Sequence, residues 1–448
     1  MSVKVSVIIP SLNSIAYYDE CIKSVMKQSL KELEIICVDA NSTDGTLELI
    51  KKYQKEDERI KLIISDKKSY GYQMNLGIAA ANGEYVGIVE SDDYIKENMY
   101  KELYALAKNK NLDILRSDIY NFYDKEKREF EYSVISYDEK FYHKDLYFES
   151  AGAVCKNTAL TKQEILKNSW NMNPPGLFSL DFLRKSRLKF HESAGASYQD
   201  LGFWFITTVS ACKIYFHKKA YYYYRQDNMG SSCNSKEKVY CLCDEYSFIK
   251  NFLKQKEEFK QYAFVLAYLR FGSYCWNMNR IDENFYFEFL CQFQKDFQKI
   301  VNDDELDRAL FLPWQLEILD TILRSPQEAL DRYYTKLYGA IDRIKNQLSY
   351  KLGEAILKAN SPLKFLKLPF TLISLAKTHQ FEQKVLQFLI RLEPKFKPLD
   401  LEKYADYEEA LKIKKHLSYR LGQALLKNPL TFIFKIPSIY QNFKKGVS

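Results

Sequence analysis

Short apolar runs rich in β-branched residues alternate with amphipathic segments along the first part of the chain. The apolar runs begin near Val3, Leu33, Ile60, Glu84 and Leu112. The segments between them, such as "AYYDECIKSVMKQ", "DGTLELIKKYQKE" and "YGYQMNLGIAAAN", carry apolar residues at helical spacing. This alternation, at roughly 25 to 30 residues per unit, predicts an α/β fold with a doubly wound, mostly parallel sheet. In such sheets, ligands bind beyond the carboxyl ends of the strands.

The pattern changes twice after the fifth strand. From about 120 to 235 it is irregular and aromatic, with turns such as "NMNPPGLFSL", and this favours a site-building extension of the first domain. Beyond 236 it is almost wholly helical. We therefore predict a sheet-based catalytic domain over 1–235, a helical domain over 236–340 and a basic helical region over 341–448.

The last region contains an internal repeat. "QLSYKLGEAILKANSPLKFLKLP", from Gln347, returns as "HLSYRLGQALLKNPLTFIFKIP", from His416. Each copy ends in a Lys-bearing apolar tail, which suits an anionic membrane surface. The alternative is a helical hairpin that packs its Leu and Phe faces into a core, with solvated lysines outside.

Composition and charge narrow the class of protein. With 46% hydrophobic and 28% charged residues, the 448-residue chain has the composition of a folded, soluble protein of two or three domains. Residues 343–448 hold 20 Lys and Arg against 8 Asp and Glu, so the net charge of +8 comes from this segment. Its lysines alternate with apolar residues and form no nucleic-acid-reading motif, which excludes nucleic acid as the expected partner.

Location is predicted from cysteines and apolar segments. Nine Cys occur without a CxxC pair, as in a reduced cytosolic protein. The N-terminus enters a strand directly and shows no signal-peptide pattern. The apolar stretch "FLKLPFTLISLA" is broken by Lys367 and Pro369 and is too short to cross a bilayer. We expect a cytoplasmic protein, peripheral at the inner membrane face if the repeat tails bind lipid.

An acidic cluster follows the strand Tyr85–Val89. Glu90, Asp92 and Asp93 lie within four residues, and such like charges need a cation, basic partners or full solvation. Carboxylates together with substrate phosphates are the usual ligands of Mg²⁺, and Mn²⁺ shares that preference. The alternative is that the aspartates cap a helix beginning near Tyr94.

Four segments, in one order, carry a family resemblance. "SVIIPSLN", "VDANSTDGT", "YGYQMNLGIAAANGEYVGIVESDD" and "GASYQDLGFWF" together resemble the family-2 glycosyltransferases of the GT-A fold, over roughly residues 3–232. The resemblance implies a nucleoside-diphosphate sugar donor, with a UDP-sugar favoured. It also implies inversion at the anomeric carbon and a Mn²⁺ or Mg²⁺ ion at Asp92 and Asp93.

Residue roles on the donor side follow from the same resemblance. Asp39 would contact the base or ribose, since a carboxylate accepts hydrogen bonds from either, and its alternative role is an Asx turn. The other residues implied in donor binding are Pro10, Ser11, Asn13, Gly71, Tyr72, Asn75, Glu90, Ser91, Asp92 and Arg225.

The chain departs from the family pattern at three positions. Ala40 follows Asp39 where a second acid is frequent, and Glu90 stands where Asp is frequent. Met74 occupies a place where a basic residue is common, so we expect Arg225 or the metal to meet part of the diphosphate charge. "STDG" is expected to start a helix, with Ser42 or Thr43 as its cap and Asp44 in the first turn.

The resemblance assigns the catalytic base to Asp200 in "YQDLGFWF". Inverting transfer needs one carboxylate that takes the acceptor hydroxyl proton, and the alternative is that Asp200 only N-caps the following helix. His191 and His217 are the other candidates. On the acceptor side lie Tyr222 and Tyr224, which are candidates to stack on a sugar, and Trp170, Asn173 and Gly176, whose roles stay unassigned.

These observations predict a metal-dependent, inverting glycosyltransferase of the hexosyltransferase type. Its acceptor would be a glycan or a lipid-linked sugar in the synthesis of a bacterial capsule, lipopolysaccharide or related surface polysaccharide. Two alternatives stay open, a nucleotidyltransferase on the same fold and a non-catalytic carbohydrate-binding scaffold.

Overall fold

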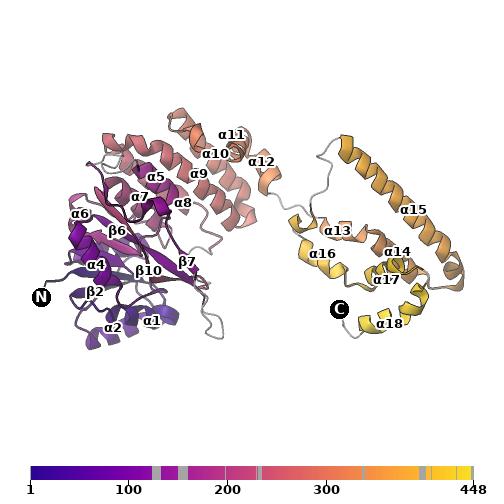
Figure 1. Cartoon of the computed structure of the whole chain (residues 1–448), viewed down its shortest axis with the longest axis horizontal. Helices are drawn as coiled ribbons and strands as arrows, with labels where there is room; N and C mark the ends of the chain where they lie inside the picture. Colours follow the sequence, from indigo (N-terminus) through magenta and orange to yellow (C-terminus); the bar gives the residue numbers. More distant parts are fainter. Residues whose placement is uncertain are drawn as a thin grey trace. The chain divides into compact units, whose positions relative to one another are not determined.

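The computed structural model describes residues 2–123, 133–149, 160–196, 198–228, 230, 235–334, 339–392, 400–404, 406–429 and 431–444. Its internal contacts divide the chain into two compact units, Met1–Arg332 and Tyr333–Ser448 (Figure 1). The helical segment from residue 236 to 332 packs within the first unit.

A single mixed sheet forms the centre of the first unit. Its order is β3-β2-β1-β4-β9-β6-β10-β5, with β7 paired to β6 and β8 to β10. β1, β2, β3 and β4 run parallel, as do β6 and β10, which confirms the predicted α/β class. The strands are β1 Val5–Ser11, β2 Leu33–Asp39, β3 Ile60–Ile64, β4 Tyr85–Ile88, β5 Tyr94–Ile95, β6 Ile114–Phe122, β7 Ser133–Ile135, β8 Leu146–Tyr147, β9 Gly176–Ser179 and β10 Lys213–Arg225.

Helices cover both faces of this sheet. Alternate residues of β1 point to opposite sides, so Val5 and Val7 join a core with α1, α2 and α4, while Ile8 joins a core with α3, α5 and α7. Figure 1 shows α1 and α2 on the opposite side of the sheet from α5 and α7. These helices are α1 Ile15–Met26, α2 Thr46–Glu56, α3 Tyr70–Ala80, α4 Met99–Lys110, α5 Lys162–Asn168, α6 Leu180–Lys185 and α7 Gln199–Ser210.

A second helical layer follows β10 in the same unit. Its core is aromatic, with Phe271 and Tyr274 packed edge-on against Phe293. The helices are α8 Cys241–Lys254, α9 Ala263–Arg280, α10 Tyr286–Asn302, α11 Pro313–Arg324 and α12 Pro326–Ala329.

Two sequence expectations about helix starts are wrong. Tyr94 and Ile95 form the short strand β5, and α4 begins only at Met99, so the aspartates before Tyr94 cap no helix. The second expectation is that "STDG" starts a helix with Asp44 in its first turn, but α2 begins at Thr46. There Asp44 Oδ1 accepts a hydrogen bond from the Thr46 N–H at 3.0 Å, so Asp44 precedes the first turn instead of lying in it.

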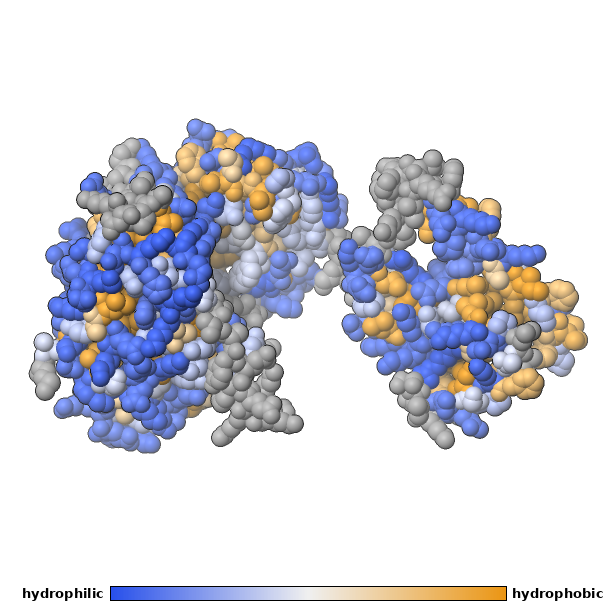
Figure 2. Space-filling view, viewed as in Figure 1, coloured by the Kyte–Doolittle hydropathy of each residue, from blue (hydrophilic) through white to orange (hydrophobic). Residues whose placement is uncertain are grey.

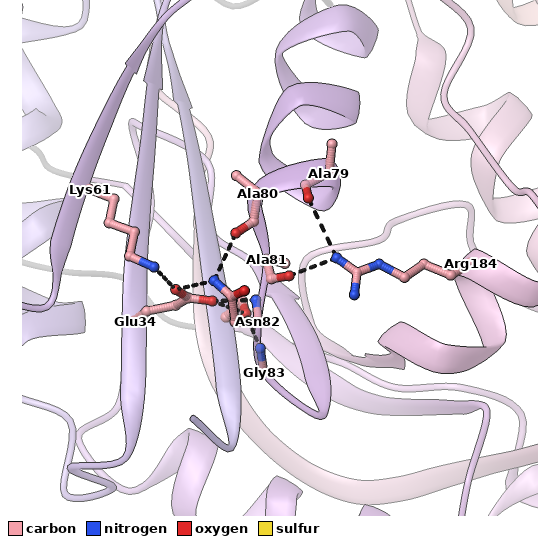
Figure 3. Close-up of polar contacts among 9 residues, drawn as sticks. Glu34, Lys61, Ala79, Ala80, Ala81, Asn82, Gly83 and Arg184 are labelled. Atoms are coloured by element: carbon pink, nitrogen blue, oxygen red, sulfur yellow. Dashed lines mark hydrogen bonds and ion pairs between the residues drawn. The ribbon is translucent and has the colours of Figure 1, made fainter. Parts of the chain in front are cut away.

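A buried carboxylate anchors the turn between α3 and β4 (Figure 3). Glu34 accepts hydrogen bonds from Ser6 Oγ and the Asn82 N–H, both at 2.6 Å, and forms an ion pair with Lys61. Burial alone would raise the pKa of Glu34, but these donors together lower it. Arg184 donates to the carbonyl of Ala81 at 2.7 Å in the same turn. These bonds fix the turn that precedes β4. The acidic cluster follows the other end of the same strand, so its position depends on this turn.

The second unit consists of two three-helix repeats. The first comprises α13 Ala340–Lys345, α14 Leu348–Lys358 and α15 Pro362–Leu392. The second comprises α16 Tyr407–Ile413, α17 Leu417–Lys427 and α18 Phe432–Lys444. Among the helices that the structure describes in either unit, none is long and apolar enough to cross a membrane.

The repeats meet at two glycines in equivalent positions. A Cβ on Gly353 would lie 1.6 Å from the carbonyl oxygen of Ser418, and a Cβ on Gly422 would lie 1.6 Å from that of Ser349. The α14 and α17 backbones therefore touch where they cross, which only glycine allows. Beside this crossing, α13 and α16 bury a small apolar cluster made up of Ala340, Ile344, Ala410 and Ile413.

Gly353→Val is expected to destabilise the second unit by about 3 kcal/mol, because the side chain would overlap the α17 backbone. The measurement is urea unfolding followed by far-UV circular dichroism, which reports both units, and by Trp fluorescence. All four Trp, at 170, 204, 276 and 314, lie in the first unit, so the fluorescence transition should stay unchanged.

Gly272→Ala in α9 is the matched control, since no atom lies within 4 Å of its Cβ position. It should be neutral or stabilising by up to about 1 kcal/mol. Equal unfolding curves for Gly353→Val and the parent would contradict the close crossing.

Candidate active site

A cleft of about 370 Å³ opens where β1 and β4 end and α7 begins. The register pairs Ser11 of β1 with Asp39 of β2, and Ile8 of β1 with Ile88 of β4, so the loops after these strands lie side by side. Of the residues predicted from the sequence, those that line the cleft are Pro10, Ser11, Asn13, Glu90, Ser91, Asp92, Tyr224 and Asp200.

Asp39 lies beneath the cleft and not on its wall. Its fully buried carboxylate accepts hydrogen bonds from Ser11 Oγ at 2.8 Å, and from the N–H and Oγ of Ser42 at 2.7 Å. Ser42 Oγ in turn accepts the Asn13 N–H at 2.8 Å. Asp39 thus ties the loop after β1 to the loop after β2 beneath the cleft.

The acidic wall of the cleft consists of Glu90 and Asp92. Tyr70 donates its hydroxyl proton to Glu90 at 2.7 Å, and Asn228 donates to Asp92 at 2.7 Å. Burial, reinforced by the negative charges of Asp92 and Asp200, raises the pKa of Glu90 to about 8. The charges of Asp92 and Asp200 therefore act on Glu90 across a single cleft.

Asp93 and Arg225 lie behind this wall. The Asp93 carboxylate is buried and accepts hydrogen bonds from the Tyr222 hydroxyl at 2.6 Å and the Arg225 N–H at 2.8 Å. Burial and the charge of Asp92 raise the pKa of Asp93. The Arg225 guanidinium donates to Glu20 at 2.8 Å and to the Asp92 carbonyl at 2.9 Å. Both residues brace the loop that presents Asp92, and neither lines the cleft.

The donor set of the cleft fits a divalent cation that the substrate helps to bind. Among the described residues, no three His, Cys, Asp or Glu side chains are close enough together to hold a metal by themselves. Asp92 and Glu90 supply hard oxygen ligands, and a magnesium-type site is commonly completed by substrate phosphates. A cation here would also offset the charges of Asp92 and Asp200, which together with burial raise the pKa of Glu90.

Asp200 lies in the first turn of α7, and the N-cap position belongs to Tyr198. The capping alternative is therefore wrong. Burial raises the pKa of Asp200 to about 6, against the opposing hydrogen bond from the Leu201 N–H. A carboxylate with that pKa is ionised at neutral pH and still basic enough to take a proton. The Asp200 carbonyl accepts a hydrogen bond from the buried Asn173 side chain at 2.9 Å, which fixes the turn.

Asn173 belongs to the aromatic segment whose role the sequence left unassigned. Arg116, buried in β6, donates to the carbonyl oxygens of Met172 and Asn173 at 3.1 Å. Burial lowers the pKa of Arg116 to about 10, although it stays protonated at neutral pH. Met172 and Pro174 line the cleft next to Asp200, while Trp170 stacks on Tyr137 away from it. Arg116 thus positions the acceptor-side wall from below.

Gly71 and Asn75 contact the segment made up of the described residues 190–196 and 198–199, which we term the strap. A Cβ on Gly71 would lie 1.8 Å from the His191 carbonyl oxygen, and the Asn75 amide exchanges hydrogen bonds of 2.9 and 3.0 Å with the Phe190 backbone. Tyr72 packs under Lys67 outside the cleft lining. The strap contacts α3 and leads into α7, and its Gly195 and Ala196 line the cleft.

The second helical layer holds the strap from its other side. Glu245 of α8 is fully buried and accepts hydrogen bonds from His191 Nδ1 at 2.7 Å and Ser193 Oγ at 3.3 Å. Tyr198 lies edge-on against Trp276 of α9 at 5.6 Å. The sequence offered His191 as a catalytic candidate, and the structure places its imidazole against Glu245 instead of in the cleft lining. His217 of β10 contacts Tyr221, also outside that lining.

Lys68 is a site residue that the sequence interpretation missed. Among the described residues that line the cleft it is the sole Lys or Arg. It follows β3, and its carbonyl accepts the Gly195 N–H at 2.7 Å, which places it at the junction of loop and strap. The sequence held one indication of such a residue. Met74 stands where a basic side chain is common, so a positively charged side chain was needed from another element.

Glu245→Ala is expected to loosen the strap, because it removes the acceptor of His191 and Ser193. We expect local protection from hydrogen exchange over residues 190–196 to fall by about 2 kcal/mol, roughly thirtyfold. Mass-spectrometric hydrogen exchange measures this, with exposed Glu237→Ala as the matched control.

The pH dependence of the strap provides a second readout. The hydrogen bond to Glu245 raises the pKa of His191, and burial raises the pKa of Glu245 to about 7. A pKa that is raised in the folded state stabilises at low pH, and this stability is lost as pH rises, from about 4.5 to about 7 for Glu245 and upward from about 6.5 for His191, so corrected protection should decline as pH rises through 7. Unchanged protection in Glu245→Ala at every pH would show that α8 does not hold the strap.

Comparison with known families gives two matches along the chain. The family described as "Glycosyl transferase family 2" matches residues 6–170. The family described as "Domain of unknown function (DUF8374)" matches residues 250–445 and so spans both structural units. Asp200 and the strap lie between the two matched segments.

Curated relatives match over the sheet-based part. "Glycosyltransferase GlyG" of Streptococcus pneumoniae is 37% identical over 123 residues, which is 27% of this chain and 41% of that protein. "Poly(ribitol-phosphate) beta-N-acetylglucosaminyltransferase TarS" of Staphylococcus aureus is 35% identical over 115 residues, which is 25% of this chain and 20% of that protein. The matches thus span less than half the length of either relative.

Crystal structures extend the similarity in fold. S. aureus TarS 1–349 in complex with UDP superposes with a TM-score of 0.53 at 21% identity, over 74% of this chain and 89% of that chain. The complex with UDP-GlcNAc has the same TM-score at 20% identity. The predicted GT-A fold is therefore confirmed, and residues 6–170 of the first unit match the family-2 glycosyltransferase model.

Proposed function

We propose that this chain is a metal-dependent, inverting glycosyltransferase that uses a nucleoside-diphosphate sugar, with UDP as the favoured nucleotide. The observation that carries the proposal is the cleft itself. It combines Glu90, Asp92 and Asp200 with Lys68, the single basic residue in the described part of its lining, at the carboxyl ends of parallel strands. A diphosphate is repelled by such a wall unless a divalent cation lies between them.

On this proposal the donor lies across the ends of β1 and β2. Pro10, Ser11 and Asn13 border the nucleotide, and Asp39 holds their loops in place. Asp92, with Glu90 beside it, would hold Mn²⁺ or Mg²⁺, which when bound neutralises the leaving diphosphate. Lys68 adds a fixed positive charge to the same leaving group. The UDP and UDP-GlcNAc complexes of TarS support this choice of donor class.

Asp200 acts as the general base in this proposal. Its carboxylate takes the proton of the acceptor hydroxyl while that oxygen attacks the anomeric carbon. The bond between that carbon and the diphosphate oxygen breaks, and the nucleoside diphosphate leaves with the electron pair. Attack opposite the leaving group inverts the configuration. Asn173 and Arg116 are positioning residues, because they fix the turn that carries Asp200.

The acceptor is proposed to be a glycan or lipid-linked sugar of a bacterial surface polysaccharide such as a capsule. The lining of the cleft that contains Asp200 also includes Met172, Pro174 and Tyr224, which would give the acceptor an apolar wall. The names of the curated relatives, which include a poly(ribitol-phosphate) glycosyltransferase, support a cell-surface polymer. We place the enzyme in the cytoplasm, at the inner face of the membrane.

Nucleotide binding is the first test. Titration calorimetry with UDP should show binding with Mn²⁺ or Mg²⁺ that is lost in EDTA, and stronger than with GDP or CDP. Asp92→Asn should weaken it about thirtyfold, equivalent to about 2 kcal/mol, because a ligand of the cation is lost.

The Asp93→Asn variant distinguishes the role of Asp93 from that of Asp92. Because Asp93 lies behind the wall, we expect it to lower stability more than metal-dependent affinity. Metal-independent UDP binding would contradict the cation, and no binding of any nucleotide would favour the scaffold alternative. Release of pyrophosphate instead of UDP would favour the nucleotidyltransferase.

Asp200→Asn should abolish sugar transfer, by at least about 10²-fold, and change UDP affinity less than twofold. In the parent enzyme, burial raises the pKa of Asp200 to about 6, so kcat/KM should fall about tenfold per pH unit below that value as the base is protonated. Product formation at saturating donor measures both effects.

Asp181→Asn, on the exposed surface of α6, is the matched control and should behave like the parent. Normal turnover in Asp200→Asn would remove Asp200 from the mechanism and leave the nucleotide site untouched.

A further inference from the structure

Helices α15 and α18 expose the most hydrophobic surface of the described chain. The five most exposed large hydrophobic side chains all lie in these two helices, and they are Phe434, Phe370, Leu366, Phe381 and Leu363. Phe434 is 83% exposed and Phe370 is 77% exposed, against 56% for Trp314, the most exposed in the first unit. Exposed patches of this kind mark interaction surfaces.

Spacing gathers these residues along one stripe of α15. Leu363, Leu366, Phe370 and Ile373 follow one another at three and four residues, which places them on one face of a helix. No residue of α15 is buried among those whose side chains are described. Figure 2 shows hydrophobic surface gathered where Figure 1 draws the beginning of α15. The core of the unit therefore does not use this stripe.

The charge around the stripe is positive. The α15 segment contains Lys364, Lys367, Lys377, Lys384 and Arg391 against one acid, Glu382. That acid is engaged by Lys351 of α14 at 3.4 Å. The α18 segment contains Lys435 and Lys444 and no acid. A partner that binds the surface of α15 and α18 must therefore combine an apolar interior with a negatively charged surface.

The repeat presents this chemistry twice. Lys367 and Pro369 of α15 correspond to Lys435 and Pro437 of α18 in the aligned repeats. Each tail follows a helix, α14 or α17, that is locked at the glycine crossing. The sequence left open whether the repeats bind membrane or pack as a core. In the structure their first two helices pack together, while the described side chains of the tails are exposed or half-buried except for Phe432 of α18, which is buried.

We propose that α15 and α18 form a two-point docking surface for an anionic phospholipid bilayer. The exposed Phe and Leu side chains enter the boundary between headgroups and acyl chains, and the lysines contact lipid phosphates. Two weak anchors on one rigid unit reinforce each other, because the second binds from a high local concentration. This inference specifies the membrane contact of the proposed function, and rests on that function only for its role.

A second copy of the chain is the less suitable occupant. Residues 343–448 carry a formal charge of +12, from 20 basic and 8 acidic residues, so pairing two such surfaces brings like charges together. An anionic bilayer meets the same charge with attraction and meets the apolar stripe with its hydrocarbon boundary. Charge complementarity therefore selects lipid.

Vesicle flotation of the full chain tests the proposal. We expect binding to phosphatidylcholine vesicles containing about 30% phosphatidylglycerol, little binding to phosphatidylcholine alone, and weakening as salt rises from about 0.1 to 0.5 M. Phe370→Ser and Phe434→Ser should each lower the partition coefficient about tenfold, and the double variant about a hundredfold. Lys364→Gln should lower it about fivefold.

Phe287→Ser is the control from the first unit, since Phe287 of α10, at 47% exposure, is the most exposed phenylalanine among the residues described there. It should bind vesicles like the parent. UDP affinity, measured on every variant, keeps a failure of the docking surface distinct from a failure of the proposed function.

Three outcomes would overturn the proposal. They are undiminished vesicle binding by the double Phe variant, equal binding to neutral and anionic vesicles, and a parent dimer that the double variant dissociates in sedimentation. The last would identify a second copy as the occupant.

Discussion

Repulsion between carboxylates is the constraint around which the catalytic unit is arranged. Glu90, Asp92 and Asp200 come from two distant parts of the chain and face one cleft, where the charges of Asp92 and Asp200 add to burial in raising the pKa of Glu90. Holding them there requires rigid support, which Tyr70, Asn228 and Asn173 supply through single hydrogen bonds. The unfavourable free energy of holding these carboxylates together is relieved when a cation binds between them or a proton binds to one of them.

The strap explains why the helical layer belongs with the sheet. Its residues touch Gly71 and Asn75 on the donor side, and Glu245 and Trp276 of the helical layer on the other. The family matches leave this segment between them. A change in the helical layer can therefore move the strap side of the cleft without altering the loops after β1 and β2.

Much of the fold and part of the site were predictable from the sequence, because they depend on local pattern. Strand and helix periods gave the parallel sheet, and Asp92 could be found because it directly follows a buried strand. The position of Asp93 outside the cleft lining could not be predicted, since its carboxylate is oriented by Tyr222, more than a hundred residues later. Glu245 carried no local signal, because a buried carboxylate on an amphipathic helix looks like any polar position. Lys68 was missed for the same reason, as its place depends on a loop.

The glycine crossing of the second unit has the geometry of a subunit interface within one chain. Gly353 contacts the Ser418 carbonyl just as Gly422 contacts the Ser349 carbonyl, which is the reciprocity of a two-fold symmetric dimer. Fusing the two copies makes their local concentration independent of how much protein the cell contains. It also frees each copy to diverge in sequence, since the partners are no longer obliged to be identical.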